Sequence, residues 1–399
     1  MPIMTMKAML DHAYQHGYAV GAFAVVNLDF VSATLAAAER SRSPVILSLA
    51  QPRFDDPDFA LLMPAVEAAA QRATVPVAIQ FDDATTLSAV VRAINLGCNG
   101  VMFDASPHPF HLNVELTREV TSIAHGCGVP VEGALGDLMG VAGKEADAHS
   151  GERVSRDISQ VKTYVQLTGI DSLAIVIGTG DGETQEDHQI NHSRLQALNK
   201  ALAMPLVLHQ GSDLATAEYR LLIANGICKI NDCTALAQAA GSRLQQNLAA
   251  GRQGYTSLMA GVRDAISEAA EQRMRQWGAA GRADALLQVS PPWAPVEHLI
   301  VYNAVADDNA IMAMMAEGRQ RLAAIPGVRE VFTGCAIQAG ARYRFSWLIR
   351  FSHPAVIDSY RNHPDHLAFA DNLFRPIAGD RISIDYQGIA ATAFPHLQG

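Results

Sequence analysis

Short apolar runs alternate with longer amphipathic segments from the N-terminus to about Arg282. Eight of the runs have the length and continuous apolar character of strands buried on both faces: residues 19–25, 45–49, 77–81, 100–103, 129–132, 172–177, 206–209 and 227–230. Helical patterns lie between them, in residues 28–40, 61–71, 87–95 and 193–203. Eight strand–helix units predict a (β/α)8 TIM barrel. An open doubly wound sheet is the alternative, which we disfavour because no Gly-x-Gly-x-x-Gly motif follows the first strand.

The pattern changes after the segment 290–295 (Ser-Pro-Pro-Trp-Ala-Pro), which interrupts helix and strand alike. Beyond it we expect a strand, a helix, two strands, two helical segments and a last strand, over residues 297–304, 308–323, 328–334, 343–351, 354–361, 365–374 and 381–386. This order predicts a ferredoxin-like α+β domain, and the exposed sheet face of so small a unit usually needs a partner. We therefore divide the chain into a barrel (residues 1–287), a Pro-rich linker (288–295) and a small α+β domain (296–399), and we expect a homodimer or a larger homo-oligomer.

Composition narrows the class of protein. The 399 residues include 30 Lys or Arg and 40 Asp or Glu, with a net charge of −10, which argues against a general nucleic-acid surface. The five cysteines lie singly, without a Cys-x-x-Cys spacing, so we expect neither a disulfide framework nor a thiolate zinc site. The N-terminus lacks a signal-peptide pattern, and no run is apolar for long enough to cross a bilayer. We expect a cytoplasmic protein that acts on a small molecule, with no nucleic-acid or membrane partner.

Polar residues follow the carboxyl ends of the predicted strands, where barrels carry their active sites. In chain order they are Asn27, Ser48, Asp82, Asp83, Asp104, Glu132, Asp181, Gly182, His209, Gly211, Ser212, Asn231 and Thr234. Because the carboxyl ends of parallel strands meet at one rim, we expect these groups to converge there, with Asn27 and Ser48 as contacts of the substrate or its phosphate.

The first chemistry that this rim suggests is metal binding. Asp83, Asp181 and His209 could hold one divalent cation, and two carboxylates with one imidazole suit Mg, Mn, Fe(II) or Zn, with a bias toward the harder ions. Such a cation would polarise a substrate carbonyl. The alternative is that the two aspartates only cap the helices that follow them.

The second chemistry is phosphate binding by backbone N–H groups and hydroxyls. Barrels often carry a phosphate site after strands seven and eight. The donors here would come from Gly182, Gly211, Ser212, Asn231 and Thr234. Ordinary turn chemistry at Gly, Ser and Asn is the alternative interpretation.

Several motifs between Ala8 and Arg282 occur in an order that matches one known family. They include Gly-Ala-Phe at 21–23 with Asn27, Phe-Asp-Ala-Ser at 103–106, Leu-Val-Leu-His at 206–209 and Gly-Ile-Cys-Lys-Ile-Asn at 226–231. This part of the chain resembles the class II, metal-dependent ketose-bisphosphate aldolases, most of all the tagatose-bisphosphate type. In that family a zinc ion in a barrel polarises a ketose phosphate, and an enediolate of dihydroxyacetone phosphate attacks or leaves an aldehyde. The resemblance implies that Asp82 handles the proton of the aldehyde-derived hydroxyl and that His209 is one of three zinc histidines.

The sequence departs from that family at several functional positions. Asp83 and Asp181 stand where the family has its other two zinc histidines, and Ala134 replaces the second glutamate of a Glu-x-Glu-Leu-Gly strand that begins at Glu132. The loop that normally carries Gly-Gly-x-Glu-Asp has Met-Gly-Val-Ala-Gly-Lys-Glu at 139–145, so the usual catalytic glutamate is missing. Carboxylates in place of imidazoles make the site harder and more anionic, which disfavours selective zinc binding. We interpret the barrel as repurposed, with a carbonyl compound still its substrate.

The C-terminal domain carries a second set of motifs. Glu-His-Leu-Ile-Val at 297–301, Ile-Pro-Gly-Val at 325–328 and His-Pro-Asp-His at 363–366 resemble the stress-responsive dimeric α/β barrel domains. Two such domains pair their sheets into a barrel with an apolar cleft. A plant member closes a ring by an aldol reaction, using a tyrosine and a histidine at positions that match Tyr360 and His366. Such a pair can act as a general acid–base couple.

The leading hypothesis is an aldolase-like carbon–carbon lyase or condensing enzyme for a small carbonyl compound, phosphorylated or not. Asp82 would move the proton, and the divergent set of Asp83, Asp181 and His209 would hold the metal. One alternative places acid–base or aldol chemistry at Tyr360 and His366, with the barrel as a scaffold. Another is a non-catalytic binding protein whose metal site has decayed. A Schiff base at Lys229 is disfavoured, because the resembling family has this lysine without that role.

Overall fold

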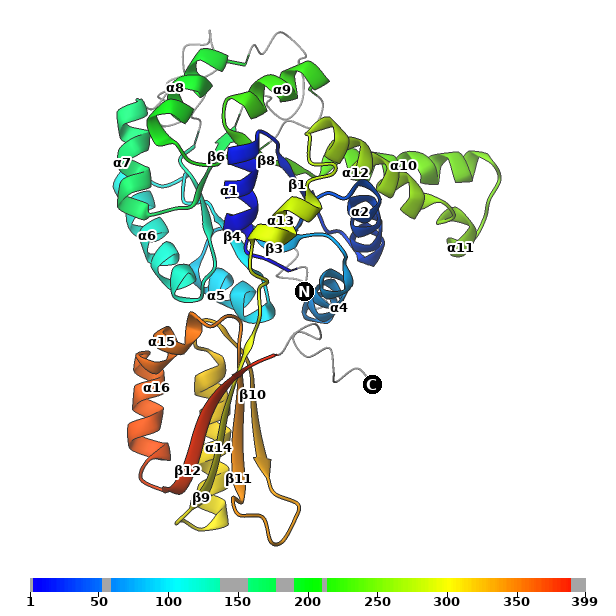
Figure 1. Cartoon of the computed structure of the whole chain (residues 1–399). Coiled ribbons are helices and arrows are strands. Elements are labelled where there is room, and N and C mark those ends of the chain that lie inside the picture. The colour runs from blue at the N-terminus through cyan, green and yellow to red at the C-terminus, as the bar shows by residue number, and fades with distance from the viewer. Residues whose placement is uncertain (1–2, 52–58, 137–156, 177–189, 210–213, 389–399) are drawn as a thin grey trace.

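The computed structural model describes residues 3–51, 59–136, 157–176, 190–209 and 214–388. Eight parallel strands close a barrel in sequential order, and the last strand pairs with the first (Figure 1). These strands are Val20–Ala24 (β1), Val45–Ala50 (β2), Val77–Ala84 (β3), Gly100–Phe103 (β4), Val131–Ala134 (β5), Ser172–Val176 (β6), Leu206–His209 (β7) and Ile227–Asp232 (β8). The predicted TIM barrel is confirmed. The doubly wound alternative is wrong, because β1 pairs with both β2 and β8 and the sheet has no edge strand.

Helices surround the barrel on its outer side (Figure 1). They are Leu28–Ser41 (α2), Phe59–Arg72 (α4), Leu87–Leu96 (α5), Phe110–Gly126 (α6), Ile158–Thr168 (α7), His192–Leu202 (α8), Thr216–Ala224 (α9), Thr234–Ala249 (α10), Tyr255–Leu258 (α11), Val262–Gln276 (α12) and Ala283–Val289 (α13). Local capping sets several of their starts, since Asn27 accepts from two N–H groups of α2 and Thr86 from one of α5. In the described part of the chain, no helix is long and apolar enough to cross a membrane.

One further helix, Met6–His16 (α1), closes the amino end of the barrel, and the repeating strand–helix pattern does not predict it. The Thr5 side chain caps its first turn, and Gly17 ends it in the left-handed conformation, at φ 63°. Met6, Met9 and Leu10 are buried in one cluster with apolar side chains of β1, β2, β3 and β8. This cluster gives the amino end of the barrel an apolar filling.

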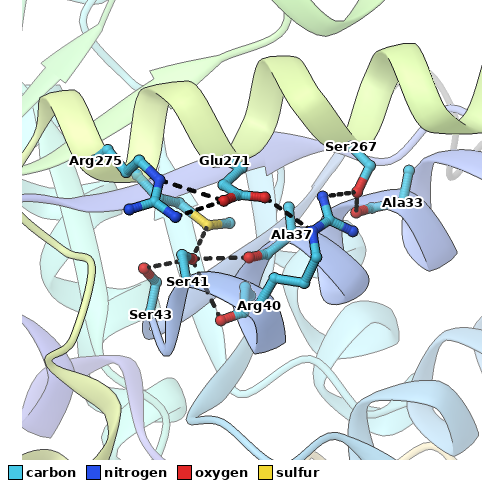
Figure 2. Close-up of polar contacts among 10 residues, drawn as sticks. Ala33, Ala37, Arg40, Ser41, Ser43, Ser267, Glu271 and Arg275 are labelled. Atoms are coloured by element: carbon cyan, nitrogen blue, oxygen red, sulfur yellow. Dashed lines mark hydrogen bonds and ion pairs between the residues drawn. The ribbon is translucent and has the colours of Figure 1, made fainter.

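Helices α2 and α12 lie side by side on the outside of the barrel, where α12 also contacts β1 (Figure 2). Ser267 donates to a carbonyl of α2 over 2.9 Å and accepts from Arg40 over 2.9 Å. Glu271 accepts from Arg40 over 2.9 Å and from Arg275 over 2.7 Å. The polar groups of this contact are therefore paired.

The C-terminal domain is a four-stranded antiparallel sheet in the order β10-β11-β9-β12, with its helices on one face (Figure 1). Its elements are Val296–Ala304 (β9), Asp308–Ala323 (α14), Val328–Cys335 (β10), Phe345–Phe351 (β11), Val356–Arg361 (α15), Pro364–Phe369 (α16), the π-helix Ala370–Phe374 (η1) and Ala378–Gln387 (β12). The predicted small α+β domain is confirmed. Its strand order places the first strand between the third and the last, as in ferredoxin-like domains.

The two faces of this sheet differ in burial. Under the helices, Tyr302 and Trp347 are fully buried and contact Phe374 edge to face. The opposite face presents apolar side chains to solvent: Phe332, Ile382, Ile384 and Tyr386 are 54%, 40%, 42% and 49% exposed. Within the described residues nothing covers this second face, which is what we expect of a domain that pairs with a partner.

The C-terminal domain is docked against the amino end of the barrel. Asn95, near the end of α5, donates to two backbone carbonyls after α14 and accepts from the Gly327 N–H over 2.8 Å. Arg329 forms a two-pronged ion pair with Glu67 of α4, over 2.6 and 2.7 Å, and Ser359 donates to the end of α6 over 2.9 Å. Because α5 and α6 end where β4 and β5 begin, this contact lies opposite the carboxyl rim.

Candidate active site

Asp82 stands near the carboxyl end of β3 and is buried, at 7% exposure. Ser48 Oγ, from β2, donates to Asp82 Oδ2 over 2.9 Å, and Asn231 Nδ2, from β8, donates to the same oxygen over 3.2 Å. Oδ1 is buried without a hydrogen-bond partner among the described residues. One carboxylate oxygen is therefore fixed, while the other retains its capacity to meet a ligand.

Glu132 of β5 is a second, fully buried carboxylate. It accepts from Lys229 Nζ over 2.7 Å, from Gln80 Nε2 over 3.1 Å and from His209 Nε2 over 2.7 Å. Burial alone would raise the pKa of Glu132, but the Lys229 charge and the His209 hydrogen bond outweigh it and lower the pKa to about 2. Glu132 is thus a permanent anion that holds an imidazole and an ammonium group.

His209, the last residue of β7, is bonded to Glu132 and lies close enough to Asp82 for their charges to interact. Burial disfavours its charged form, but the hydrogen bond and negative charge of Glu132 prevail, and the pKa of His209 is raised. Asn231 Nδ2 lies 3.2 Å from His209 Nε2, but both nitrogens are donors when Nε2 donates to Glu132, so this contact is not a hydrogen bond. With Nε2 bonded to Glu132, Nδ1 is the ring nitrogen left for a ligand.

Asp83 follows Asp82 in an unusual backbone conformation. Its φ of 56° is in the left-handed region, which it shares with only two other non-glycine residues in the described part of the chain. The side chain reaches solvent, yet its surroundings raise its pKa to about 6, mainly through partial burial and then through the Asp82 charge. Backbone strain of this kind gathers at functional sites, because the surrounding fold must hold it in place.

The predicted metal ligands are only partly described. Asp83 and His209 both lie at the rim, close enough for their charges to interact, whereas Asp181 lies outside the described residues. Within the described ranges, no group of three His, Cys, Asp or Glu side chains is placed to hold a metal ion. The metal site therefore stays a prediction that depends on Asp181.

The predicted phosphate and substrate residues fall into two groups. Gly182, Gly211 and Ser212 lie outside the described residues. Thr234 is the first residue of α10, directly after β8. Asn27 uses its side-chain oxygen to cap α2, and Ser48 contacts Asp82. Both side chains thus have a structural contact beside any role in binding substrate.

The C-terminal domain brings Tyr360 and His366 together as predicted. Their rings lie 4.4 Å apart, centroid to centroid, on the wall of a cleft of about 200 Å³. His298 stands beside Tyr360 in the same cleft and pairs with Asp385 over 2.6 Å. Burial raises the pKa of Tyr360 and lowers that of His366, which favours the neutral form of both.

Sequence reasoning missed the roles of Gln80 and Lys229 as partners of Glu132. A signal was present, because each is a polar residue within an otherwise apolar strand, and such a residue needs a buried partner. What the sequence did not reveal is which carboxylate each one meets. Lys229, considered above for a Schiff base, is instead an ion-pair partner of Glu132 in this structure.

Comparisons with known proteins agree with this geometry. Residues 4–282 match the family described as Fructose-bisphosphate aldolase class-II, and residues 298–387 match the Stress responsive A/B Barrel Domain. The chain is 35% identical over 289 residues to a probable fructose-bisphosphate aldolase of Bacillus subtilis, which covers 71% of this chain and 100% of that protein. The crystal structure of the YdjI aldolase from Escherichia coli K12 matches with a TM-score of 0.61 and 31% identity, covering 70% of this chain and 99% of the other.

A structure titled as a putative fructose-1,6-biphosphate aldolase from Coccidioides immitis matches with a TM-score of 0.62 and 27% identity, over 69% of this chain and 97% of the other. These relatives align over nearly their whole lengths but only about 70% of this chain, so the C-terminal domain is an addition to what they contain. Both resemblances drawn from the sequence are confirmed. The chain belongs to the class II fructose-bisphosphate aldolase family, and a stress-responsive A/B barrel domain follows its barrel.

Proposed function

We propose that the barrel is an aldolase-like carbon–carbon lyase or condensing enzyme for a small carbonyl compound, with or without a phosphate group. The observation that carries this proposal is the Asp82 carboxylate, buried at the rim with Oδ2 held by Ser48 and Asn231 and with Oδ1 unpartnered among the described residues. Membership of the family supports the reaction type. The departures at Asp83 and Asp181 favour a substrate range different from that of the named relatives.

Asp82 would carry the proton of the reaction. In cleavage, Oδ1 takes the proton from the substrate hydroxyl, and the carbon–carbon bond breaks to give an aldehyde. The electrons of that bond move onto the other fragment as an enolate, which is then protonated to a ketone. In condensation, Asp82 returns the proton to the new hydroxyl.

The Lys229–Glu132–His209 chain would support this chemistry by orientation. Lys229 and Glu132 are fully buried and neutralise each other, so the pair is firmly held inside the barrel. Glu132 in turn fixes the ring of His209. We propose that this arrangement presents Nδ1 of His209 toward the substrate side of the rim.

The family is typically zinc-dependent, and the described residues fit one divalent cation in part. A histidine that binds metal usually donates its other ring N–H to a carboxylate, which is the arrangement of His209 and Glu132. We propose His209, Asp83 and Asp181 as the ligands, a set that suits Mn, Mg or Fe(II) at least as well as Zn. When bound, the cation would polarise the substrate carbonyl.

A phosphate group on the substrate would have its own contacts. We propose that these are Gly182, Gly211, Ser212, Asn231 and Thr234.

An assay of carbon–carbon cleavage tests the proposal. The full chain, loaded in turn with Zn, Mn and Mg, is given fructose 1,6-bisphosphate, unphosphorylated ketoses and 4-hydroxy-2-keto acids, and the released aldehyde is measured. We expect cleavage of at least one compound and its loss in Asp82→Asn. Asp171→Asn, a change of a largely buried aspartate at the amino end of β6, is the matched control and should retain activity. Unchanged turnover in Asp82→Asn would rule out the proposed role of this carboxylate.

Elemental analysis tests the metal ligands independently of activity. We expect about one equivalent of divalent metal per chain, as one shared site requires, and its loss in the Asp83→Ala, His209→Ala double variant. If the double variant still binds the metal, the metal site does not include Asp83 and His209. A wild-type protein that takes up no metal after loading would contradict the proposed ligand set.

The C-terminal cleft is the second candidate, favoured by the neighbouring rings of Tyr360 and His366 and by the His298–Asp385 pair. Here Tyr360 and His366 would exchange a proton with a small ligand in the cleft. The test is the Tyr360→Phe, His366→Ala double variant in the same assay. Activity that disappears in this variant but survives in Asp82→Asn would move the chemistry from the barrel to the cleft.

We further propose that a second copy of the chain covers the exposed apolar face of the C-terminal sheet, giving a homodimer or larger homo-oligomer in the cytoplasm. The exposure of Ile382, Ile384 and Phe332 supports this. Light scattering should give at least twice the chain mass, and Ile384→Lys should reduce it to the monomer. A monomeric wild type would contradict the proposal.

A further inference from the structure

The two oxygens of the Asp82 carboxylate have different surroundings. Oδ2 accepts two hydrogen bonds, from Ser48 and Asn231, while Oδ1 is buried with no partner among the described residues. A buried carboxylate rotates toward its donors, because an anionic oxygen without a donor is costly. The side of Asp82 on which the donors lie therefore decides which oxygen meets the substrate.

Ser48 is the donor dedicated to Asp82. Its contact, at 2.9 Å, is shorter than the 3.2 Å contact of Asn231, whose amide nitrogen also lies 3.2 Å from His209 Nε2. Ser48 and Asp82 lie on adjacent strands, where Ala50 is opposite Asp82 and Ser48 is opposite Gln80. Since alternate residues share a face of a strand, Ser48 lies on the same face as Ala50, and its hydroxyl reaches Asp82 from below the rim. Ser48 is only 5% exposed, so water has little access to replace it.

We propose that Ser48 is a positioning residue that holds Asp82 Oδ2 and so commits Oδ1 to proton exchange with the substrate. This inference rests on the proposed function of the barrel. The sequence predicts Ser48 as a contact of the substrate or its phosphate, and the present inference gives Ser48 a different role. Ser48 acts on the reaction through Asp82, because holding Oδ2 leaves the lone pairs of Oδ1 free to accept a proton.

The first test is a crystal structure of the Ser48→Ala variant of the full chain beside that of the wild type. We expect the Asp82 carboxylate of the variant to be rotated or to take two orientations, because only Asn231 then holds it. Ser48→Thr keeps the hydroxyl and should keep the wild-type orientation. Ser172→Ala is the matched control, because Ser172 is equally buried in the barrel and its hydroxyl has no hydrogen-bond partner among the described residues. An unchanged Asp82 in Ser48→Ala would overturn the inference.

The second test separates orientation from substrate binding by kinetics on whichever compound the cleavage assay identifies. In Ser48→Ala we expect kcat to fall about tenfold or more with little change in KM, the effect of a misplaced proton carrier, and recovery in Ser48→Thr. A raised KM with unchanged kcat would instead make Ser48 a substrate contact and overturn the inference. If the wild type cleaves none of the compounds, the proposed function fails, while the orientation of Asp82 in the variant structures still decides the role of Ser48.

Discussion

The barrel rim and the C-terminal cleft are both candidate sites, but they are held together in different ways. At the rim, side chains of β2 and β8 donate to Asp82 of β3, and side chains of β3, β7 and β8 donate to Glu132 of β5. Glu132 and Lys229 have no exposure to solvent. In the cleft, aromatic rings pack against one another, and the ion pair His298–Asp385 has side chains 18% and 36% exposed. The polar groups of the rim are therefore buried and paired with one another, whereas the cleft combines aromatic rings with charged side chains and a partly solvated ion pair.

This difference determines what a substitution reports. Removing one side chain of a buried polar cluster leaves its partner without a hydrogen bond or counter-ion. Activity and stability therefore change together. Removing one member of a solvated pair lets water take its place. We therefore expect substitutions at the rim to change the free energy of unfolding strongly and substitutions in the cleft to change it weakly. A loss of activity in a cleft variant is then easier to assign to chemistry, because the fold is little affected.

The largest effect on stability should come from Glu132→Gln. This change leaves Lys229 charged, fully buried and without its counter-ion, and breaking a buried ion pair in this way costs about 3–5 kcal/mol of unfolding free energy. Urea denaturation measures it. The Glu132→Gln, Lys229→Met double variant should recover part of the loss, and a single variant as stable as the wild type would show that Glu132 and Lys229 do not form a buried ion pair.

The largest effect on activity should come from Asp82→Asn, which removes the proposed proton carrier and keeps its shape. We expect kcat/KM for the cleaved compound to fall by about 10²–10⁴-fold, the usual contribution of a general acid–base group. The Tyr360→Phe, His366→Ala variant should keep wild-type kcat/KM, since the C-terminal domain docks on the opposite end of the barrel. If kcat/KM instead falls in the Tyr360→Phe, His366→Ala variant and is unchanged in Asp82→Asn, the cleft and not the rim is the active site.

The sequence predicted the barrel strands because each is a short apolar run, as in residues 206–209 and 100–103. It predicted the C-terminal strands from alternating apolar and polar residues, as in residues 381–386. It also placed Asp82 and His209 at one rim, because parallel strands end together. It could not predict that Ser48 meets Asp82 or that Lys229 meets Glu132, which lies 97 positions away. Such contacts depend on the register and stagger of strands around a closed barrel, which no local pattern encodes.

An intermediate effect is expected at the contact between the two regions. Arg329→Ala removes a two-pronged ion pair with Glu67 whose side chains are only 17% and 21% exposed, and we expect a loss of about 1–2 kcal/mol. Calorimetry of the full chain measures it, and a Glu67→Ala, Arg329→Ala cycle isolates the pair. A wild type that unfolds in two separate transitions would show that the barrel and the cleft are stabilised independently of each other.

The smallest effect should come from Asp385→Asn, the cleft counterpart of Glu132→Gln. Both substitutions remove the negative charge that faces a histidine at a distance near 2.7 Å, since His298 lies 2.6 Å from Asp385 and His209 lies 2.7 Å from Glu132. The side chain of Asp385 is 36% exposed, so water can solvate His298 in the variant, and we expect a loss of about 0.5 kcal/mol or less. The same urea denaturation measures both variants. Equal losses at the two sites would mean that burial does not distinguish them, and the C-terminal cleft would then have to be regarded as a buried polar site like the rim.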